Sequence, residues 1–190
     1  MTLDTADIPQ ADQLWDVARV AEAIARGRHD TEEIAAYIGM KVPRQGHYYT
    51  QAARILGLVT EGEPGEAPRL TTLGRSFVRS NRVEQRTFLR RLLLQREPTR
   101  SVIIRLRARD GLDRQELAET LQQLAPLAAS TASRRAHTIA AWLCAVDLAE
   151  WQNDRLVYTG PAFVGAAGAQ ASSPAGDAEG WGNVSSPWSR

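Results

Sequence analysis

The pattern of apolar and polar positions predicts three helices followed by a hairpin in the first half of the chain. Apolar residues recur at intervals of three and four, as on a helix with one buried face, over residues 14–26, 31–38 and 44–56. The short segments 58–60 and 69–71 flank a stretch rich in Gly, Pro and Glu, a pattern typical of two strands joined by a turn. Three helices and a hairpin in this order predict a winged helix-turn-helix.

The second half of the chain repeats this order. An alanine-rich helical run and a returning strand at 52–74 have counterparts at 140–160. Upstream, Asp30 and Asp113 each stand where a helix should begin, and a Glu follows each of them three residues later. That spacing is typical of a capping box, in which the two side chains accept backbone N–H groups of the first turn. We interpret the halves as two copies of one unit; a chance similarity between alanine-rich helices is the alternative.

The predicted fold is therefore mainly α with small β-hairpin wings, arranged as a tandem winged helix-turn-helix. Residues after 160 are mostly Gly, Ala, Ser and Pro, a composition that predicts disorder. Trp181 and Trp188 in that stretch fit either a docking motif or chance. The expected parts are a flexible N-terminal arm at 1–13, a first winged helix at 14–80, an arginine-rich connecting helix at 81–98, a second winged helix at 99–160 and a disordered tail at 161–190.

Composition argues against several classes of protein. No apolar run approaches the ~20 residues that a membrane-spanning helix needs, and residues 1–13 carry no basic residue, unlike a secretory signal. The single cysteine, Cys144, cannot form an internal disulfide or build a metal site alone. We expect a cytoplasmic protein without a membrane partner, associated with the nucleoid when it is bound to DNA.

Arginine dominates the charged positions. Lys41 is the one lysine among 23 basic residues, and the net charge is only +1. Ten arginines lie between positions 79 and 109, against two glutamates. Such a block attracts phosphates; the alternative is a solvated helix surface whose charge is balanced elsewhere. Arg82, Arg86 and Arg90 recur every four residues, so they form one row that we expect to contact the DNA backbone.

The third helix of the first unit is the predicted DNA-reading element. Helical spacing places four residues on its core face: Tyr49, Ala52, Ala53 and Leu56. The other side chains then face outward, where Arg and Gln can pair with base edges and His and Tyr can contact phosphates. The predicted DNA-binding residues of this unit, including one on the wing, are Arg44, Gln45, His47, Tyr48, Gln51, Arg54 and Arg69. Tyr48 could instead pack against the wing, and His47 could be an ordinary exposed histidine.

The matching helix of the second unit has a more apolar outer face. Ile139 and Trp142 occupy positions equivalent to polar residues of the first unit. An exposed Ile–Trp pair would normally be covered, so we expect this face to be an interface with the first unit, the connecting helix or a second copy in a homodimer. Arg134 and Arg135 remain candidates for phosphate contacts. His137 aligns with Tyr49 and is expected at the edge of the core.

The sequence carries no constellation for catalysis. The three histidines, His29, His47 and His137, lack paired acids or cysteines at metal-ligand spacing. No glycine-rich phosphate loop precedes a helix with a lysine, and the acid-plus-lysine centre of common restriction nucleases is missing. Acidic pairs such as Glu32-Glu33 are interpreted as helix caps or exposed faces. We expect a protein that is not an enzyme and needs no metal and no cofactor.

One segment resembles a known winged-helix family. It runs from Arg44 to Leu58, with an Arg-Gln pair, a Tyr-Tyr pair, two alanines and Leu-Gly-Leu, and is closed by Leu70-Thr71-Thr72-Leu73-Gly74. That family occurs beside, or fused to, bacterial type II restriction enzymes and related defence proteins. The resemblance covers residues 14–80, with a weaker extension to 160. It implies DNA binding, with a nuclease or methyltransferase as a candidate partner, but not cleavage, because the fused nuclease is missing.

Two functional hypotheses follow from these patterns. The first is a double-stranded DNA-binding protein, either sequence-reading or general, in a restriction, defence or transcription-regulation context. The second is a protein–protein adaptor built from tandem winged helices, which the apolar face of the second unit and the tryptophans of the tail favour. A shift assay with random duplex DNA at low salt separates them.

Overall fold

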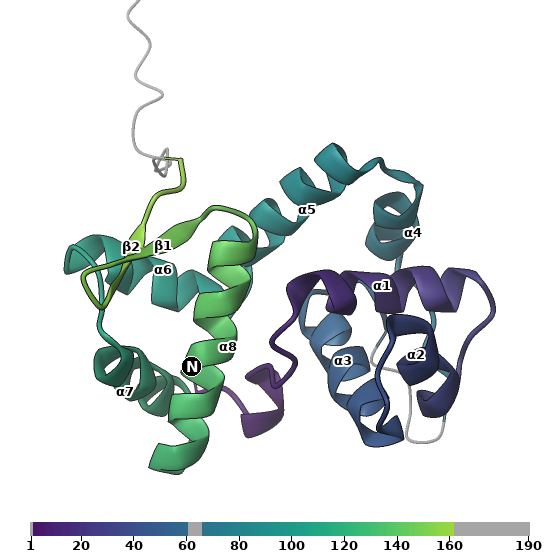
Figure 1. Ribbon diagram of the computed structural model, residues 1–190, viewed down its shortest axis with the longest axis horizontal. Helices are drawn as coiled ribbons and strands as arrows, with labels where there is room; N and C mark the ends of the chain where they lie inside the picture. The colour runs from purple at the N-terminus through teal and green to yellow at the C-terminus, as the bar shows by residue number, and fades with distance from the viewer. Residues whose placement is uncertain (1, 61–65, 162–190) are drawn as a thin grey trace, which may run out of the picture.

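The computed structural model describes residues 2–60 and 66–161, and within these ranges the chain is mainly helical, with one small antiparallel sheet (Figure 1). The elements in chain order are the 3-10 helix η1 (Thr5–Asp7), α1 (Leu14–Ala25), α2 (Thr31–Ile38), α3 (Pro43–Ile55), α4 (Thr72–Arg79), α5 (Arg82–Gln95), α6 (Thr99–Ala108), α7 (Arg114–Leu124), α8 (Ala129–Ala145), β1 (Ala149–Gln152) and β2 (Arg155–Tyr158).

Helices α1, α2 and α3 pack on one another at one end of the molecule (Figure 1). The N-cap Asp30 accepts the Glu33 N–H at 2.7 Å, as the cap pattern predicts. The reciprocal half of the box is different, because the Glu33 carboxylate accepts the His29 N–H instead. Helix α3 lies so close to α2 that a Cβ at Gly46 would overlap the Thr31 carbonyl oxygen. The absence of a side chain at Gly46 therefore sets how closely the two helices approach.

The predicted wing of the first half is shorter than a full hairpin in the described residues. Val59 and Leu70 form a single antiparallel bridge. One flanking backbone bond joins the Thr60 N–H to the Arg69 carbonyl at 2.8 Å. The turn predicted between these segments falls largely on 61–65, outside the described residues, as does the predicted tail apart from residue 161.

The second half places α6, α7 and α8 beside the β1–β2 hairpin (Figure 1). Asn153 and Asp154 both have positive φ, 46° and 62°, which suits the tight turn between the strands. Leu112, just before α7, pairs with Leu156 and adds a third short strand segment to the hairpin. At the start of α7 the complete predicted capping box forms around Asp113.

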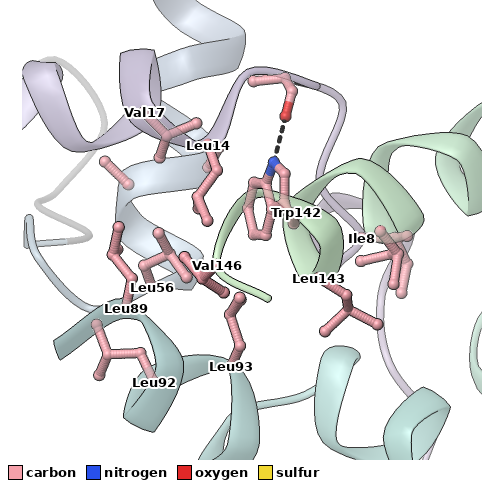
Figure 2. Close-up of a cluster of buried hydrophobic side chains, with 14 of the residues drawn as sticks. Ile8, Leu14, Val17, Leu56, Leu89, Leu92, Leu93, Trp142, Leu143 and Val146 are labelled. Atoms are coloured by element: carbon pink, nitrogen blue, oxygen red, sulfur yellow. Dashed lines mark hydrogen bonds between the residues drawn. The ribbon is translucent and has the colours of Figure 1, made fainter. Parts of the chain in front are cut away.

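The N-terminal segment is not the flexible arm that its composition predicts. Ile8 and Ala11 are buried. The Arg135 side chain donates to the Ile8 carbonyl at 2.8 Å, and the Trp142 indole N–H donates to the Ala11 carbonyl at 2.8 Å (Figure 2). Asp4 of this segment lies outside this contact and caps η1. The segment is therefore part of the packed structure.

One apolar core joins the two halves. Leu89 and Leu93 of α5 are fully buried, and Figure 2 shows them near Leu56 of the first half and Val146 of the second. Trp142 of α8 is buried with them at 0% exposure. Helix α5, in the stretch predicted as a connection, thus contributes core residues between the halves, because its leucines face the core while its arginines face outward.

Candidate nucleic-acid interface

The outer face of α3 brings together three of the predicted DNA-binding residues. The core face is confirmed, since all four of its predicted residues are buried. On the other side, Arg44 and His47 are exposed and Tyr48 is half-buried. The Arg44 guanidinium lies 5.4 Å from the centroid of the Tyr48 ring. The His47 ring meets the same tyrosine edge-on, with ring centroids 6.1 Å apart.

A buried tyrosine fixes the orientation of this face. Tyr49 follows Tyr48 in α3 but points inward, where its hydroxyl donates to an Asp12 carboxylate oxygen at 3.3 Å. Burial, with the nearby negative charges of Asp12 and Asp16, raises the pKa of Tyr49 to about 12. The phenol therefore stays protonated and keeps donating across the ordinary pH range.

The segment around α3 carries positive charge only. Residues 41–60 contain Lys41, Arg44 and Arg54 and no Asp or Glu. Helix α3 has no side-chain N-cap bond and no acid in its first turn, so the positive end of its dipole is not offset by a carboxylate there. Lys41 is exposed beside this end. It was missed as a candidate, although a lone lysine directly before the predicted helix was a signal.

The remaining predicted residues of α3 face elsewhere. The Gln51 amide donates to the Ala6 carbonyl at 3.4 Å, and Arg54 donates through Nε to the Thr60 carbonyl at 3.1 Å. Gln45 is half-buried. Helical spacing assigned these side chains to the outer face, but it carries no information on Ala6 and Thr60, which supply their partners. Arg69 is exposed on the returning segment.

The arginines of the α5 row lie at the surface, and each of them contacts a partner within the chain. The Arg82 guanidinium stacks 3.2 Å from the ring centroid of Trp15. Arg86 and Arg90 form ion pairs with Asp147 at 3.2 and 2.9 Å. Arg90 also donates to the Val146 carbonyl. The carbonyl end of α8 attracts cations, so Arg86 and Arg90 brace the second half against α5, while Arg82 joins α5 to α1 of the first half.

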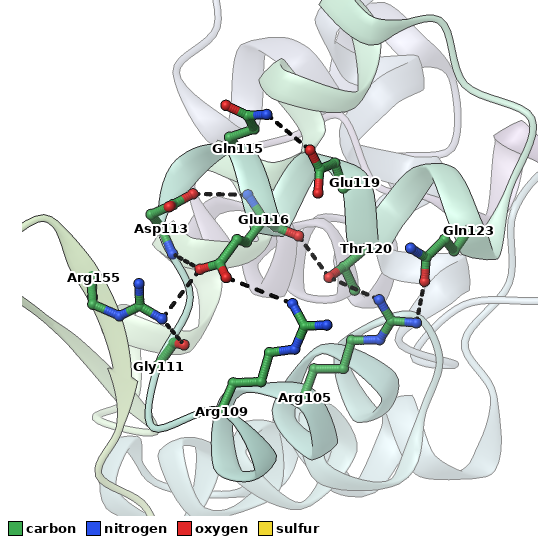
Figure 3. Close-up of polar contacts among 10 residues, drawn as sticks. All are labelled: Arg105, Arg109, Gly111, Asp113, Gln115, Glu116, Glu119, Thr120, Gln123 and Arg155. Carbon is green, nitrogen blue, oxygen red and sulfur yellow. Dashed lines mark hydrogen bonds and ion pairs between the residues drawn. The ribbon is translucent and has the colours of Figure 1, made fainter.

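Other arginines of the basic block are also paired. Figure 3 shows Glu116, at the start of α7, between Arg109 and Arg155, with ion-pair distances of 3.6 and 3.2 Å. Arg100 pairs with Glu97 at 3.7 Å. The positive charge concentrated between positions 79 and 109 is thus partly neutralised inside the chain, as the alternative interpretation of the block held.

The predicted residues of α8 separate into buried and exposed ones. Ile139 and Trp142, predicted as an interface, are fully buried. Helix α1 packs against α8, and the Trp142 indole N–H bonds to the Ala11 carbonyl, so this face is covered from within the chain, which was one of the expected alternatives. Arg135 is only 8% exposed, and burial lowers its pKa, so it does not reach outward to phosphates. Arg134 is exposed, and so is His137, which was expected at the core edge. The alignment of His137 with Tyr49 therefore placed the wrong side of α8 at the edge of the core.

Two further surface residues of the second half were missed by the sequence reasoning. Arg114 follows the N-cap of α7, and its guanidinium lies 5.0 Å from the centroid of the Trp151 ring on β1. Both line a cleft with Arg134 and His137. A tryptophan on a predicted hairpin, with an arginine at the start of the capped helix that follows Asp113, was the available signal.

The part of the chain that the structure describes holds no group of three His, Cys, Asp or Glu side chains arranged to bind a metal ion. None of its helices combines the length and hydropathy needed to cross a membrane. Among known protein families, the one described as Domain of unknown function (DUF7226) matches residues 16–146 of this chain. No curated protein and no solved structure matches the chain.

Proposed function

We propose that this chain, which belongs to the DUF7226 family, binds double-stranded DNA with α3 in the major groove. The observation that carries the proposal is the outer face of α3. There Arg44 and His47 flank Tyr48 on a segment without any acidic residue. An exposed arginine and histidine on such a helix can contact phosphates and base edges.

The arrangement of the elements supports two winged helix-turn-helix units. In the second half, three helices precede a hairpin, and Leu112 pairs with Leu156 beside it. In the first half, α1, α2 and α3 precede the bridge between Val59 and Leu70. A recognition helix that follows a shorter helix and a tight connection suits entry into the major groove.

The stacking around Tyr48 supports base or phosphate recognition by Arg44. A guanidinium held over an aromatic ring keeps its N–H groups at the edge, where they can meet guanine O6 and N7 or a phosphate. Part of the rotamer entropy of the arginine is then lost before binding rather than during it. Lys41 and Arg69, both exposed, would add contacts to the DNA backbone.

We further propose that the protein works by binding rather than by catalysis, in the cytoplasm. The resemblance of residues 44–74 to winged helices of restriction systems supports a restriction, defence or transcription-regulation role, with a nuclease or methyltransferase as partner. The adaptor hypothesis rested partly on an exposed apolar face at Ile139 and Trp142. Because both side chains are buried within the chain, that face offers it no support, and Trp181 and Trp188 lie outside the described residues.

Fluorescence anisotropy with a labelled random duplex, measured between 50 and 200 mM salt, tests the proposal. Three phosphate-contacting cations, Lys41, Arg44 and Arg69, predict a slope of log K against log salt of about −3. Arg44→Ala should weaken binding and reduce the magnitude of the slope by about 1. The matched control is Arg109→Ala, which removes the same charge from an arginine paired with Glu116 and should leave the affinity within about twofold.

Two results would overturn the proposal. One is the lack of any binding at micromolar protein and low salt, which would favour an adaptor. The other is equal weakening by Arg44→Ala and Arg109→Ala, because the attraction would then come from overall charge and not from the α3 face. Circular dichroism of each variant establishes that the fold is retained.

A further inference from the structure

A cleft of about 490 Å³ lies between the N-terminal segment and the second half of the chain. The lining residues that carry its chemistry are Asp12, Arg114, Arg134, His137 and Trp151. Small-molecule sites typically enclose roughly 300–1,000 Å³ and combine apolar walls with a few polar groups. This cleft has the size and the mixed lining of such a site, and the α3 face is not part of it.

We propose that the cleft binds a nucleotide: a planar aromatic base, a sugar with free hydroxyls and a phosphate. The cleft supplies a group for each part of that ligand. Trp151 offers a ring for the base, Asp12 an acceptor for the sugar hydroxyls, and Arg114 and Arg134 donors for the phosphate.

The ring of Trp151 is held in place yet accessible. The residue is 37% exposed, and its strand β1 is paired with β2, which is fastened in turn to the start of α7 by the Leu112–Leu156 bridge. Stacking on an aromatic side chain is the common way in which proteins hold a base without reading its edges. The hairpin fixes the backbone that carries the ring, and the ring itself is in contact with Arg114.

The two arginines of the cleft, Arg114 and Arg134, differ from other arginines of the second half in that they form no ion pair with a described residue. Within the described residues, Arg114 and Arg134 have no carboxylate within ion-pair distance, whereas Glu116 holds Arg109 and Arg155. Arg114 rests on the Trp151 ring, which leaves the edge of its guanidinium for an oxyanion. Arginine pairs with phosphate through two parallel N–H···O bonds, which makes it suited to this ligand.

A buried donor lies beside the same cleft. Arg135 lines a smaller pocket of about 100 Å³ that shares Gln10, Arg134 and Thr138 with the cleft. Its Nε is buried and bonds to no other group in the described part of the chain. A buried N–H favours an acceptor next to it, so an anionic ligand reaching this corner would gain a further partner.

The acid in the cleft distinguishes a nucleotide from a bare anion. Asp12 would repel a free phosphate placed beside it, which weakens the case for an oxyanion site alone. One of its oxygens accepts from the Tyr49 hydroxyl, and the other can accept from a ribose hydroxyl. The combination of one carboxylate with two arginines therefore matches a ligand that has both hydroxyls and a phosphate.

Isothermal titration calorimetry with the full chain and the four nucleoside 5′-monophosphates tests this inference, with adenosine and inorganic phosphate as partial ligands. At least one monophosphate should bind with a Kd below about 1 mM. Arg134→Ala, Arg114→Ala and Trp151→Ala should each weaken it about tenfold or more, as expected for loss of a charge-assisted bond or a stacking partner. Arg109→Ala, outside the cleft, should change the Kd by less than twofold.

Several outcomes would overturn the inference. These are no binding of any monophosphate, inorganic phosphate binding as tightly as the monophosphate, or affinity that is unchanged in the Arg134 and Trp151 variants. If monophosphates do not bind but Arg134→Ala weakens duplex binding, the cleft belongs to a DNA contact instead. The inference does not rest on the DNA proposal, because Arg44→Ala should leave nucleotide binding unchanged whether or not DNA binds.

Discussion

Replacing Trp142 with alanine should destabilise the chain more than almost any other single truncation. The indole is fully buried where the N-terminal segment, α1, α5 and α8 meet (Figure 2). Truncation of a buried tryptophan to alanine costs about 3–5 kcal/mol, because burial is lost and a cavity is left. The Ala11 carbonyl also loses its 2.8 Å bond, which adds about 1 kcal/mol. The total free energy of unfolding of a domain is roughly 5–15 kcal/mol, so such a loss would remove a large fraction of it.

Urea unfolding followed by far-ultraviolet circular dichroism measures this loss. Trp142→Phe keeps most of the apolar contact and should cost only about 1–2 kcal/mol. Trp151→Ala removes a tryptophan that is partly exposed on the hairpin and should cost less than about 1 kcal/mol. Because the halves share one core, the wild-type protein should unfold in a single transition. A cost below about 1 kcal/mol for Trp142→Ala, or separate transitions for the two halves, would refute the shared core.

Three smaller perturbations test other parts of the structure. Asp147→Asn keeps a side chain that tolerates the positive φ of 54° there but removes both ion pairs to α5. Because the pairs are partly exposed, thermal unfolding at low salt should show a loss of stability of about 1 kcal/mol or less, and this loss should fade at 1 M salt. The pKa of Tyr49 is about 12 in the folded protein and about 10 in the unfolded chain. The contribution of this group to stability should therefore be complete below pH 10 and be lost between pH 10 and 12. Tyr49→Phe should flatten this decline in the free energy of unfolding. Gly46→Ala would push α3 away from the backbone of α2 and should cost about 1–3 kcal/mol in urea unfolding; a neutral result would contradict the close approach.

The helices of this chain were predictable because their signals are local. Apolar spacing and the cap at Asp113 act within one or two turns, so the sequence alone locates α1, α2, α3 and α7. The core face of α3, including Tyr49, follows from the same spacing. The turn of the β1–β2 hairpin is also local, since it is formed by Asn153 and Asp154, two residue types that tolerate the positive φ seen there.

The contacts between distant segments were not predictable from local patterns. Residues 1–13 were expected to form a flexible arm, but the carbonyl groups of Ile8 and Ala11 bond to side chains more than a hundred positions away. In the same way, the spacing of the α5 arginines shows that they form a row but not that Asp147 lies opposite. The candidate site changed accordingly, since Arg135, a candidate for phosphate contacts, lies in the packed interior, and the face of Trp142 is covered by other parts of the same chain.

The most direct test of the central claim is a map of backbone amide chemical-shift changes when a short duplex is added to ¹⁵N-labelled protein. The account predicts that the largest changes fall on residues 41–51 and around Arg69, and that they shrink when salt is raised from 50 to 200 mM. Changes confined to α8 and the β1–β2 hairpin, or no changes at low salt, would contradict the assignment of α3 as the DNA-binding helix.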